Sequence, residues 1–198
     1  MEKLTLVKIG GNIIDDENAL NDFLTLFQLV PGKKILVHGG GKIATELSKK
    51  MGLDPEMVKG RRVTDAEMLK VVTMVYAGLT NKTIIAKLQG LDCNALGLTG
   101  ADGNVLVAEK RPITDVDFGF VGDITEANVN TDFLSSIINQ NIIPVFSAIT
   151  HDGQGQLFNT NADTVASTIA VALARLYDVR LIYSFEKKGV LKDINDEN

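Results

Sequence analysis

The stretch of sequence that decides the fold is LTLVKIGGN, at residues 4–12. Its apolar run from Leu4 to Ile9 has the length and composition of a buried β-strand, which the glycine pair at 10 and 11 ends. Lys8 lies inside this run, directly before Ile9. An ammonium group in a buried parallel strand is costly unless it meets an opposite charge. Two interpretations are therefore open: Lys8 faces an anion beyond the strand end, or it lies in an edge strand and extends to water.

A second predicted strand ends in the same way. Residues 34–38 run into the three glycines at 39–41, and a helical pattern starts at Ile43. In open α/β sheets, ligands bind beyond the carboxyl ends of the strands, and glycine lets backbone N–H groups approach an anion. Two such turns favour binding of two anionic groups, one from each of two substrates; the alternative is that the glycines only make tight connections. Neither turn has the spacing of a P-loop or of G-x-G-x-x-G, which argues against a Rossmann oxidoreductase.

Strand and helix patterns alternate along the rest of the chain. Helices are predicted at residues 17–29, 43–51, 64–77, 81–89, 132–139 and 162–176, and further strands at 95–98, 105–108, 142–146 and 179–183. Thr64 with Glu67 has capping-box spacing, and Thr131 and Asn161 are predicted N-caps. Pro144 indicates a sheet edge or a strand end. The alternation predicts an α/β protein with an open, mostly parallel sheet and helices on both faces.

Composition and charge exclude several classes of protein. The chain has 198 residues, 45% of them hydrophobic, which is ordinary for a globular protein. A net charge of -5 argues against broad nucleic-acid binding, although local cations can still gather around a small anion. We find neither a signal peptide nor an apolar run that could span a bilayer, and therefore expect a cytoplasmic protein with no membrane partner. Cys93 is expected to be a small buried hydrophobe, and His38 a structural residue rather than a base.

Seven short segments occur in a fixed order along the chain. They are KIGG (8–11), HGGG (38–41), RRVTD (61–65), GLTNK (78–82), GFVGD (119–123), IPV (143–145) and NTNAD (159–163). The ordered set makes the sequence resemble the amino acid kinase family from Leu4 to about Ala174, and it is most similar to members that act on N-acylated glutamate.

The resemblance implies a reaction and its cofactor. The side-chain carboxylate of an N-acyl-L-glutamate would attack the γ-phosphoryl group of ATP, a step of arginine biosynthesis. No general base is required, because a carboxylate is already ionised at pH 7. Mg²⁺ would arrive with ATP and be held largely by phosphates and water, so that no metal-binding residue is expected in the protein.

The resemblance also implies roles for individual residues at the phosphoryl-transfer end. Lys8 would stabilise charge on the transferring phosphoryl group, and Asp163 would orient the catalytic lysines by charge pairing. Gly10 and Gly11 would supply backbone donors near the phosphates. For Asp163, at the first turn of a predicted helix, plain helix capping explains the residue type as well.

Four further residues would hold the acylated amino acid. Gly40 and Gly41 would bind it through backbone N–H groups, Arg62 would clamp a carboxylate with its planar fork, and Asn159 would hydrogen-bond its amino-acid end. Arg62 has a competing interpretation as a surface arginine, and the neighbouring Arg61 leaves the choice open. Capping is likewise an alternative for Asn159.

The resemblance finally implies a domain division and an assembly. Residues 1–176 would form the acylglutamate-binding and dimerisation domain, and residues 177–198 would begin an incomplete nucleotide-binding domain whose second catalytic lysine lies beyond Asn198. Glu186, where the family usually has aspartate, puts nucleotide contacts nearby in doubt. Family members pair through the substrate domain, which implies a homodimer or a higher homo-oligomer.

Two other hypotheses stay open. One is another enzyme of the family, acting on aspartate, glutamate, carbamate or a nucleoside monophosphate. The other is a non-catalytic protein that keeps only the binding of acylglutamate.

Overall fold

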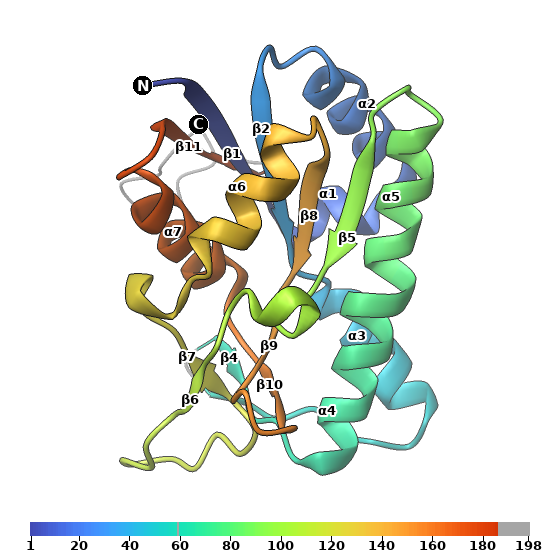
Figure 1. The fold of residues 1–198 in the computed structure, drawn as a ribbon. Helices are drawn as coiled ribbons and strands as arrows, with labels where there is room; N and C mark the ends of the chain where they lie inside the picture. Colours follow the sequence, from blue (N-terminus) through green and yellow to red (C-terminus); the bar gives the residue numbers. More distant parts are fainter. Residues whose placement is uncertain (59, 186–198) are drawn as a thin grey trace, which may run out of the picture.

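A parallel sheet forms the centre of the molecule (Figure 1). The structure is a computed structural model that describes residues 1–58 and 60–185. Its five-stranded sheet has the order β11-β1-β2-β8-β5, and every neighbouring pair is parallel. The strands are β1 (Lys3–Ile9), β2 (Lys33–His38), β5 (Ala95–Leu98), β8 (Ile143–Ser147) and β11 (Asp178–Ser184).

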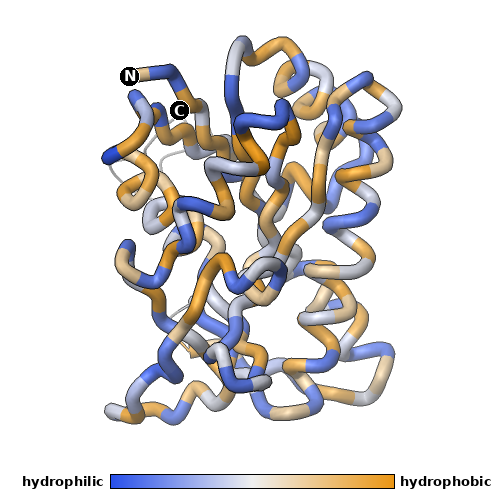
Figure 2. The backbone as a smooth tube through the Cα atoms, viewed as in Figure 1, coloured by the Kyte–Doolittle hydropathy of each residue, from blue (hydrophilic) through white to orange (hydrophobic). Residues whose placement is uncertain are grey.

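Helices cover both faces of this sheet, as predicted. One face packs on α2 (Glu17–Gln28) and α5 (Asn81–Gln89), and the other on α6 (Thr131–Asn139) and α7 (Ala162–Leu173). Each face buries its own apolar cluster, because successive strand side chains point to opposite sides. Figure 2 shows hydrophobic stretches both on the central strands and on the helices that cover them.

Smaller elements lie beyond the carboxyl ends of the strands, below the sheet in Figure 1. Three antiparallel hairpins are found there: β3 (Met57–Val58) with β4 (Arg61–Arg62), β6 (Glu109–Lys110) with β7 (Gly122–Asp123), and β9 (Ile149–His151) with β10 (Leu157–Asn159). The helices α3 (Gly41–Lys50) and α4 (Ala66–Thr73) complete a third apolar cluster with β9. Further short helices are α1 (Gly11–Asp15), η2 (Asp102–Asn104) and η3 (Glu126–Asn128).

The helix predicted at 64–77 and the helix predicted at 81–89 form one helical run. Between α4 and α5 the backbone is π-helical over η1 (Met74–Thr80) instead of breaking at Gly78. π-helical turns inside α-helices are frequent at functional sites. Here the segment carries Tyr76 and Thr80, which lie against the second glycine turn.

Two predicted helix caps are wrong by one residue. The side chain of Asp65, not Thr64, caps α4 by accepting a hydrogen bond from the N–H of Met68. The side chain of Asn130, not Thr131, caps α6 in the same way. Both residue types are good N-caps, so the local sequence alone does not choose between neighbours.

Two strand predictions also need correction. Residues 105–108 form only isolated bridges, at Leu106 and Val107. The strand with Pro144 is interior, between β2 and β5, so the edge interpretation is wrong. Pro144 is tolerated because it is the second residue of β8, and pairing with β2 starts only at Val145.

The expected domain boundary after residue 176 falls between α7 and β11. In the structure β11 pairs with β1 over its whole length, from Asp178 to Ser184. Residues 186–198, including Glu186, lie outside the described residues. Within the described part of the chain, no helix combines the length and the apolar character needed to cross a membrane.

Candidate active site

Lys8 pairs with Asp163 at the carboxyl end of the sheet. Its Nζ lies 2.8 Å from Asp163 Oδ1, and the Lys8 side chain is only 17% exposed. β1 lies between β11 and β2, so the edge-strand interpretation of Lys8 is wrong. Lys8 lies on the same face of β1 as Leu4 and Leu6, whose side chains pack in one cluster with those of α7. Strand pairing and helix packing thus bring the two charges together from opposite ends of the chain.

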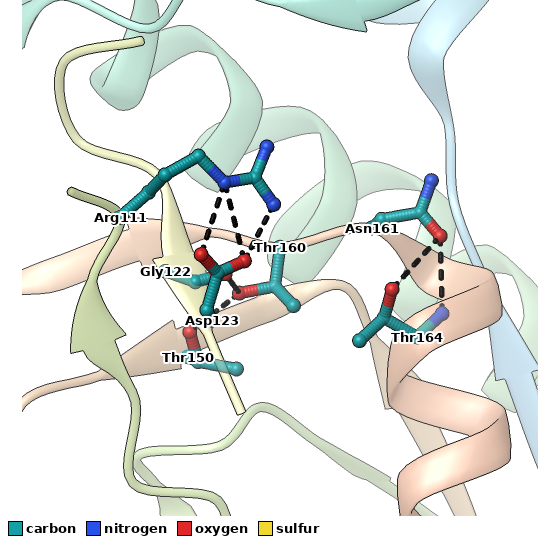
Figure 3. Close-up of polar contacts among 7 residues, drawn as sticks. All are labelled: Arg111, Gly122, Asp123, Thr150, Thr160, Asn161 and Thr164. Carbon is teal, nitrogen blue, oxygen red and sulfur yellow. Dashed lines mark hydrogen bonds and ion pairs between the residues drawn. The ribbon is translucent and has the colours of Figure 1, made fainter. Parts of the chain in front are cut away.

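Asn161, rather than Asp163, caps helix α7. Its Oδ1 accepts hydrogen bonds from the N–H groups of Asp163 and Thr164, the second of which is drawn in Figure 3. The carboxylate of Asp163 therefore has no capping role at the helix end and is directed to Lys8. The cap therefore belongs to Asn161, and the Asp163 carboxylate is left to pair with Lys8.

The first glycine turn connects β1 to α1. The N–H of Gly10 is donated to the carbonyl of Ser184 at 2.8 Å. Gly11 is the first residue of α1, and the first N–H groups of a helix have no acceptor within it. Gly11 is therefore better placed than Gly10 for the predicted donor role.

The second glycine turn is held against η1. Gly40 has φ +154°, and a Cβ there would lie 3.0 Å from the ring of Tyr76 and 3.2 Å from Thr80 Oγ1. A side chain at this position would meet both close contact and an unfavourable backbone conformation. Gly41 is the first residue of α3. The first N–H groups of this helix, which have no acceptor within the helix, therefore lie at the end of the glycine turn.

Arg62 is buried, which removes the surface interpretation. It is 7% exposed, whereas Arg61 is exposed. Its Nη2 donates to the carbonyl of Gly41 at 2.8 Å and to Thr45 Oγ1 at 2.7 Å. These bonds fix the guanidinium beside the second glycine turn. Burial raises the pKa of the neighbouring Tyr76 hydroxyl, and the Arg62 charge opposes that rise, so Tyr76 stays neutral at pH 7.

Asn159 ends β10 and is also buried. Its Nδ2 donates to Thr64 Oγ1 at 3.0 Å, and its N–H donates to the carbonyl of Phe120. Thr64 Oγ1 in turn donates to the carbonyl of Arg62. A chain of hydrogen bonds therefore links Asn159 to Arg62 through Thr64, and neither Asn159 nor Arg62 is a helix cap.

Sequence reasoning missed Arg111, which follows β6. It forms a two-pronged ion pair with Asp123 in β7, where Nε lies 3.0 Å from Oδ2 and Nη2 2.5 Å from Oδ1 (Figure 3). Asp123 ends the GFVGD segment, but no local pattern connects it to an arginine twelve residues earlier. Only the hairpin shows the pairing.

One cavity gathers most of these residues. It has a volume of about 180 Å³ and lies between the second glycine turn, the β3–β4 hairpin, Val121 just before β7, and the start of α7. Its polar lining includes Gly40, Gly41, Arg62, Arg111, Asn159 and Thr160. Lys8 and Asp163 do not line the cavity. Asp163 is nevertheless next in sequence to Ala162, which does line it. The arrangement can bind a small anion with backbone and guanidinium donors, beside a paired ammonium group.

His38 is structural, as expected. It is fully buried at the end of β2, with Nδ1 2.7 Å from the carbonyl of Gly39 and Nε2 3.0 Å from Asn81 Nδ2. An amide nitrogen only donates, so Nε2 accepts and Nδ1 carries the proton. Burial lowers the pKa of His38 to about 4.

We expect this buried histidine to make stability depend on pH. The unfolded chain takes up a proton at His38 below about pH 6.5, whereas the folded chain does so only near pH 4. The contribution is therefore complete above about pH 6.5 and is lost as pH falls, by about 3 kcal/mol in all. Urea unfolding of the wild type and of His38→Asn at pH 7 and pH 4.5 measures it. Equal pH dependence in the two proteins would contradict the assignment.

The fold and the site define a class: an α/β protein with a cavity at the carboxyl end of a parallel sheet, lined by groups that can donate hydrogen bonds to a small anion. The sequence pattern of the amino acid kinase family matches residues 3–195. The chain belongs to the amino acid kinase family.

Three relatives that the chain matches are named acetylglutamate kinases. The chain is 56% identical to an acetylglutamate kinase of Phocaeicola vulgatus, over 100% of this chain and 76% of the relative. It is 55% identical to an acetylglutamate kinase of Bacteroides fragilis, over 99% and 74% of the two chains. To an acetylglutamate kinase of Methanopyrus kandleri it is 40% identical, over 98% and 75%.

Solved structures show the same fold. A Streptococcus mutans protein has a TM-score of 0.81 at 26% identity, over 96% of this chain and 75% of that one. An N-acetylglutamate synthase of Neisseria gonorrhoeae has a TM-score of 0.78 at 23% identity, over 96% and 42%. The chain spans about three quarters of the length of the acetylglutamate kinases that it matches.

Proposed function

We propose that this protein is an acetylglutamate kinase, which transfers the γ-phosphoryl group of ATP to the side-chain carboxylate of N-acetyl-L-glutamate. The observation that carries the proposal is the position of the Lys8–Asp163 pair beside a cavity with a glycine turn and the buried Arg62. The names of the relatives supply the substrate.

Each group has a task in this reaction. Backbone N–H groups at Gly40 and Gly41 hold the accepting carboxylate, and Arg62 binds the α-carboxylate together with Asn159. Lys8 stabilises the negative charge on the phosphoryl group in transfer, since phosphoryl transfer depends on positioned cations more than on covalent chemistry. Asp163 keeps the ammonium of Lys8 in place.

The donors at the end of β1 fit a phosphate group. They are the ammonium of Lys8 and the first N–H groups of α1, starting with Gly11. ATP would supply the phosphoryl group, with Mg²⁺ held mainly by phosphate oxygens and water. Among the residues that the structure describes, no group of three or more His, Cys, Asp or Glu side chains could hold a metal ion.

Three further expectations belong to this proposal. Residues 1–176 bind the acylglutamate and residues 177–198 begin the part that binds the nucleotide. The protein forms a homodimer or a higher homo-oligomer. It works in the cytoplasm, a reducing compartment that suits the buried free thiol of Cys93.

The test is formation of an acyl phosphate. The purified chain is incubated with ATP, Mg²⁺ and N-acetyl-L-glutamate, and the product is trapped with hydroxylamine. Hydroxamate that forms only when all three are present supports the proposal. If calorimetry detects binding of N-acetyl-L-glutamate but no hydroxamate forms, the chain binds the substrate without catalysing the reaction, and the catalytic proposal is wrong.

Arg62→Met is expected to weaken binding of N-acetyl-L-glutamate about 10- to 100-fold, because a hydrogen-bonded carboxylate loses its charged partner. Calorimetry without nucleotide measures the dissociation constant. Arg175→Met is the matched control, since Arg175 is exposed and is not among the residues that line the cavity, so this variant should bind like the wild type. Equal losses in both variants would mean that removal of any one arginine charge, not of the buried guanidinium, weakens binding.

A further inference from the structure

Arg111 presents a rigidly held guanidinium group to the cavity. Asp123 accepts hydrogen bonds from its Nε and Nη2, and the guanidinium also lies over the ring of Phe118, 5.5 Å from its centre. A two-pronged carboxylate contact fixes both the position and the plane of an arginine side chain. The side chain is only 16% exposed. Such a group is prepared to bind a ligand without first being ordered.

One end of this guanidinium remains available. Asp123 engages Nε and Nη2, and Figure 3 shows Nη1 pointing away from the carboxylate. Within residues 1–58 and 60–185, the structure gives Nη1 no hydrogen-bond partner. Because Arg111 lines the cavity, the free N–H groups of Nη1 are donors for whatever the cavity holds.

The position of Arg111 indicates which part of the substrate it meets. Its N–H donates to the carbonyl of Val121, and Val121 forms a bridge with Asn159, so Arg111 lies one strand beyond Asn159. In the proposed function the glycine turn holds one carboxylate and Arg62 holds the other. The N-acyl amide is then the part of the substrate that has no binding residue assigned to it.

Charge balance favours a neutral acceptor at this place. Asp123 neutralises Arg111, so the pair carries no net charge. A further carboxylate would meet the nearby Asp123 charge as well as the arginine, whereas an amide carbonyl needs only a donor.

We propose that the Arg111–Asp123 pair determines specificity for the N-acyl group, with Arg111 Nη1 donating a hydrogen bond to the acyl carbonyl oxygen. The inference rests on the proposed function. It adds a residue pair that recognises the acyl group itself, separate from the residues that hold the two carboxylates.

The test compares two ligands that differ by the acylamino group. Glutarate has both carboxylates of N-acetyl-L-glutamate at the same spacing, but it has no acetylamino group on the carbon that corresponds to the α-carbon. Calorimetry on the full chain measures both dissociation constants for the wild type and for Arg111→Met. The variant should bind N-acetyl-L-glutamate about 10- to 100-fold more weakly and glutarate within about 2-fold of the wild type.

Two more variants keep the test decisive. Lys110→Met, exposed and next in sequence, should leave both affinities unchanged. The double variant Arg111→Met with Asp123→Asn removes the carboxylate that would otherwise lose its partner, and should discriminate like Arg111→Met. Equal weakening of both ligands, or no weakening of N-acetyl-L-glutamate, overturns the inference alone. A wild type that binds neither ligand overturns the proposed function instead.

Discussion

Replacement of Lys8 by methionine is expected to lower kcat about 1,000-fold, because removal of one positioned electrostatic group costs about 10²–10³ in rate. The ammonium is the cation that β1 holds at the carboxyl end of the sheet, paired with Asp163 at 2.8 Å. Its attraction for the phosphoryl group strengthens as charge develops, so the loss should fall on kcat rather than on KM. Steady-state hydroxamate formation at saturating ATP and N-acetyl-L-glutamate measures both constants.

Lys3→Met provides the matched control. Lys3 is exposed at the opposite end of the same strand, so the variant removes one positive charge from β1 without touching the site. It should keep wild-type kcat and KM. If Lys8→Met kept more than about a tenth of the wild-type kcat, Lys8 would not be the catalytic cation, since one such group accounts for at least 10²-fold.

Replacement of Gly119 by alanine is expected to lower the free energy of unfolding by about 4 kcal/mol, from backbone strain together with overpacking. Gly119 has φ +72°, and an added Cβ would lie 2.3 Å from the carbonyl oxygen of Thr64. That carbonyl accepts the N–H of Phe120, so the contact involves backbone that cannot rotate away. Thermal or urea unfolding measures the loss. Affinity for N-acetyl-L-glutamate should fall too, because Thr64 accepts the hydrogen bond that orients Asn159.

Gly52→Ala separates the two causes. Gly52 has nearly the same conformation, φ +78°, but an added Cβ there has nothing within 4 Å. It should lose only about 1 kcal/mol, the cost of a side chain in the left-handed region. If Gly119→Ala were no more destabilising than Gly52→Ala, the close approach to Thr64 would not be a structural constraint.

The sequence by itself determined the elements whose signals are local. The apolar run before Gly10, the glycines at 39–41 and the cap at Asn161 depend on neighbours in the chain, and the structure confirms these elements. The alternation of strands and helices was sufficient for the parallel α/β class. The ordered segments were sufficient for the family, which the match over residues 3–195 confirms.

Only the tertiary structure decided which side chains meet. Arg61 and Arg62 look alike in sequence, but only Arg62 faces inward from its short strand. Lys8 reaches Asp163 because α7 packs across β1, and Arg111 reaches Asp123 because β6 pairs with β7. These contacts depend on strand order and helix packing, which join residues far apart in the chain, and a local pattern carries no information about such distances.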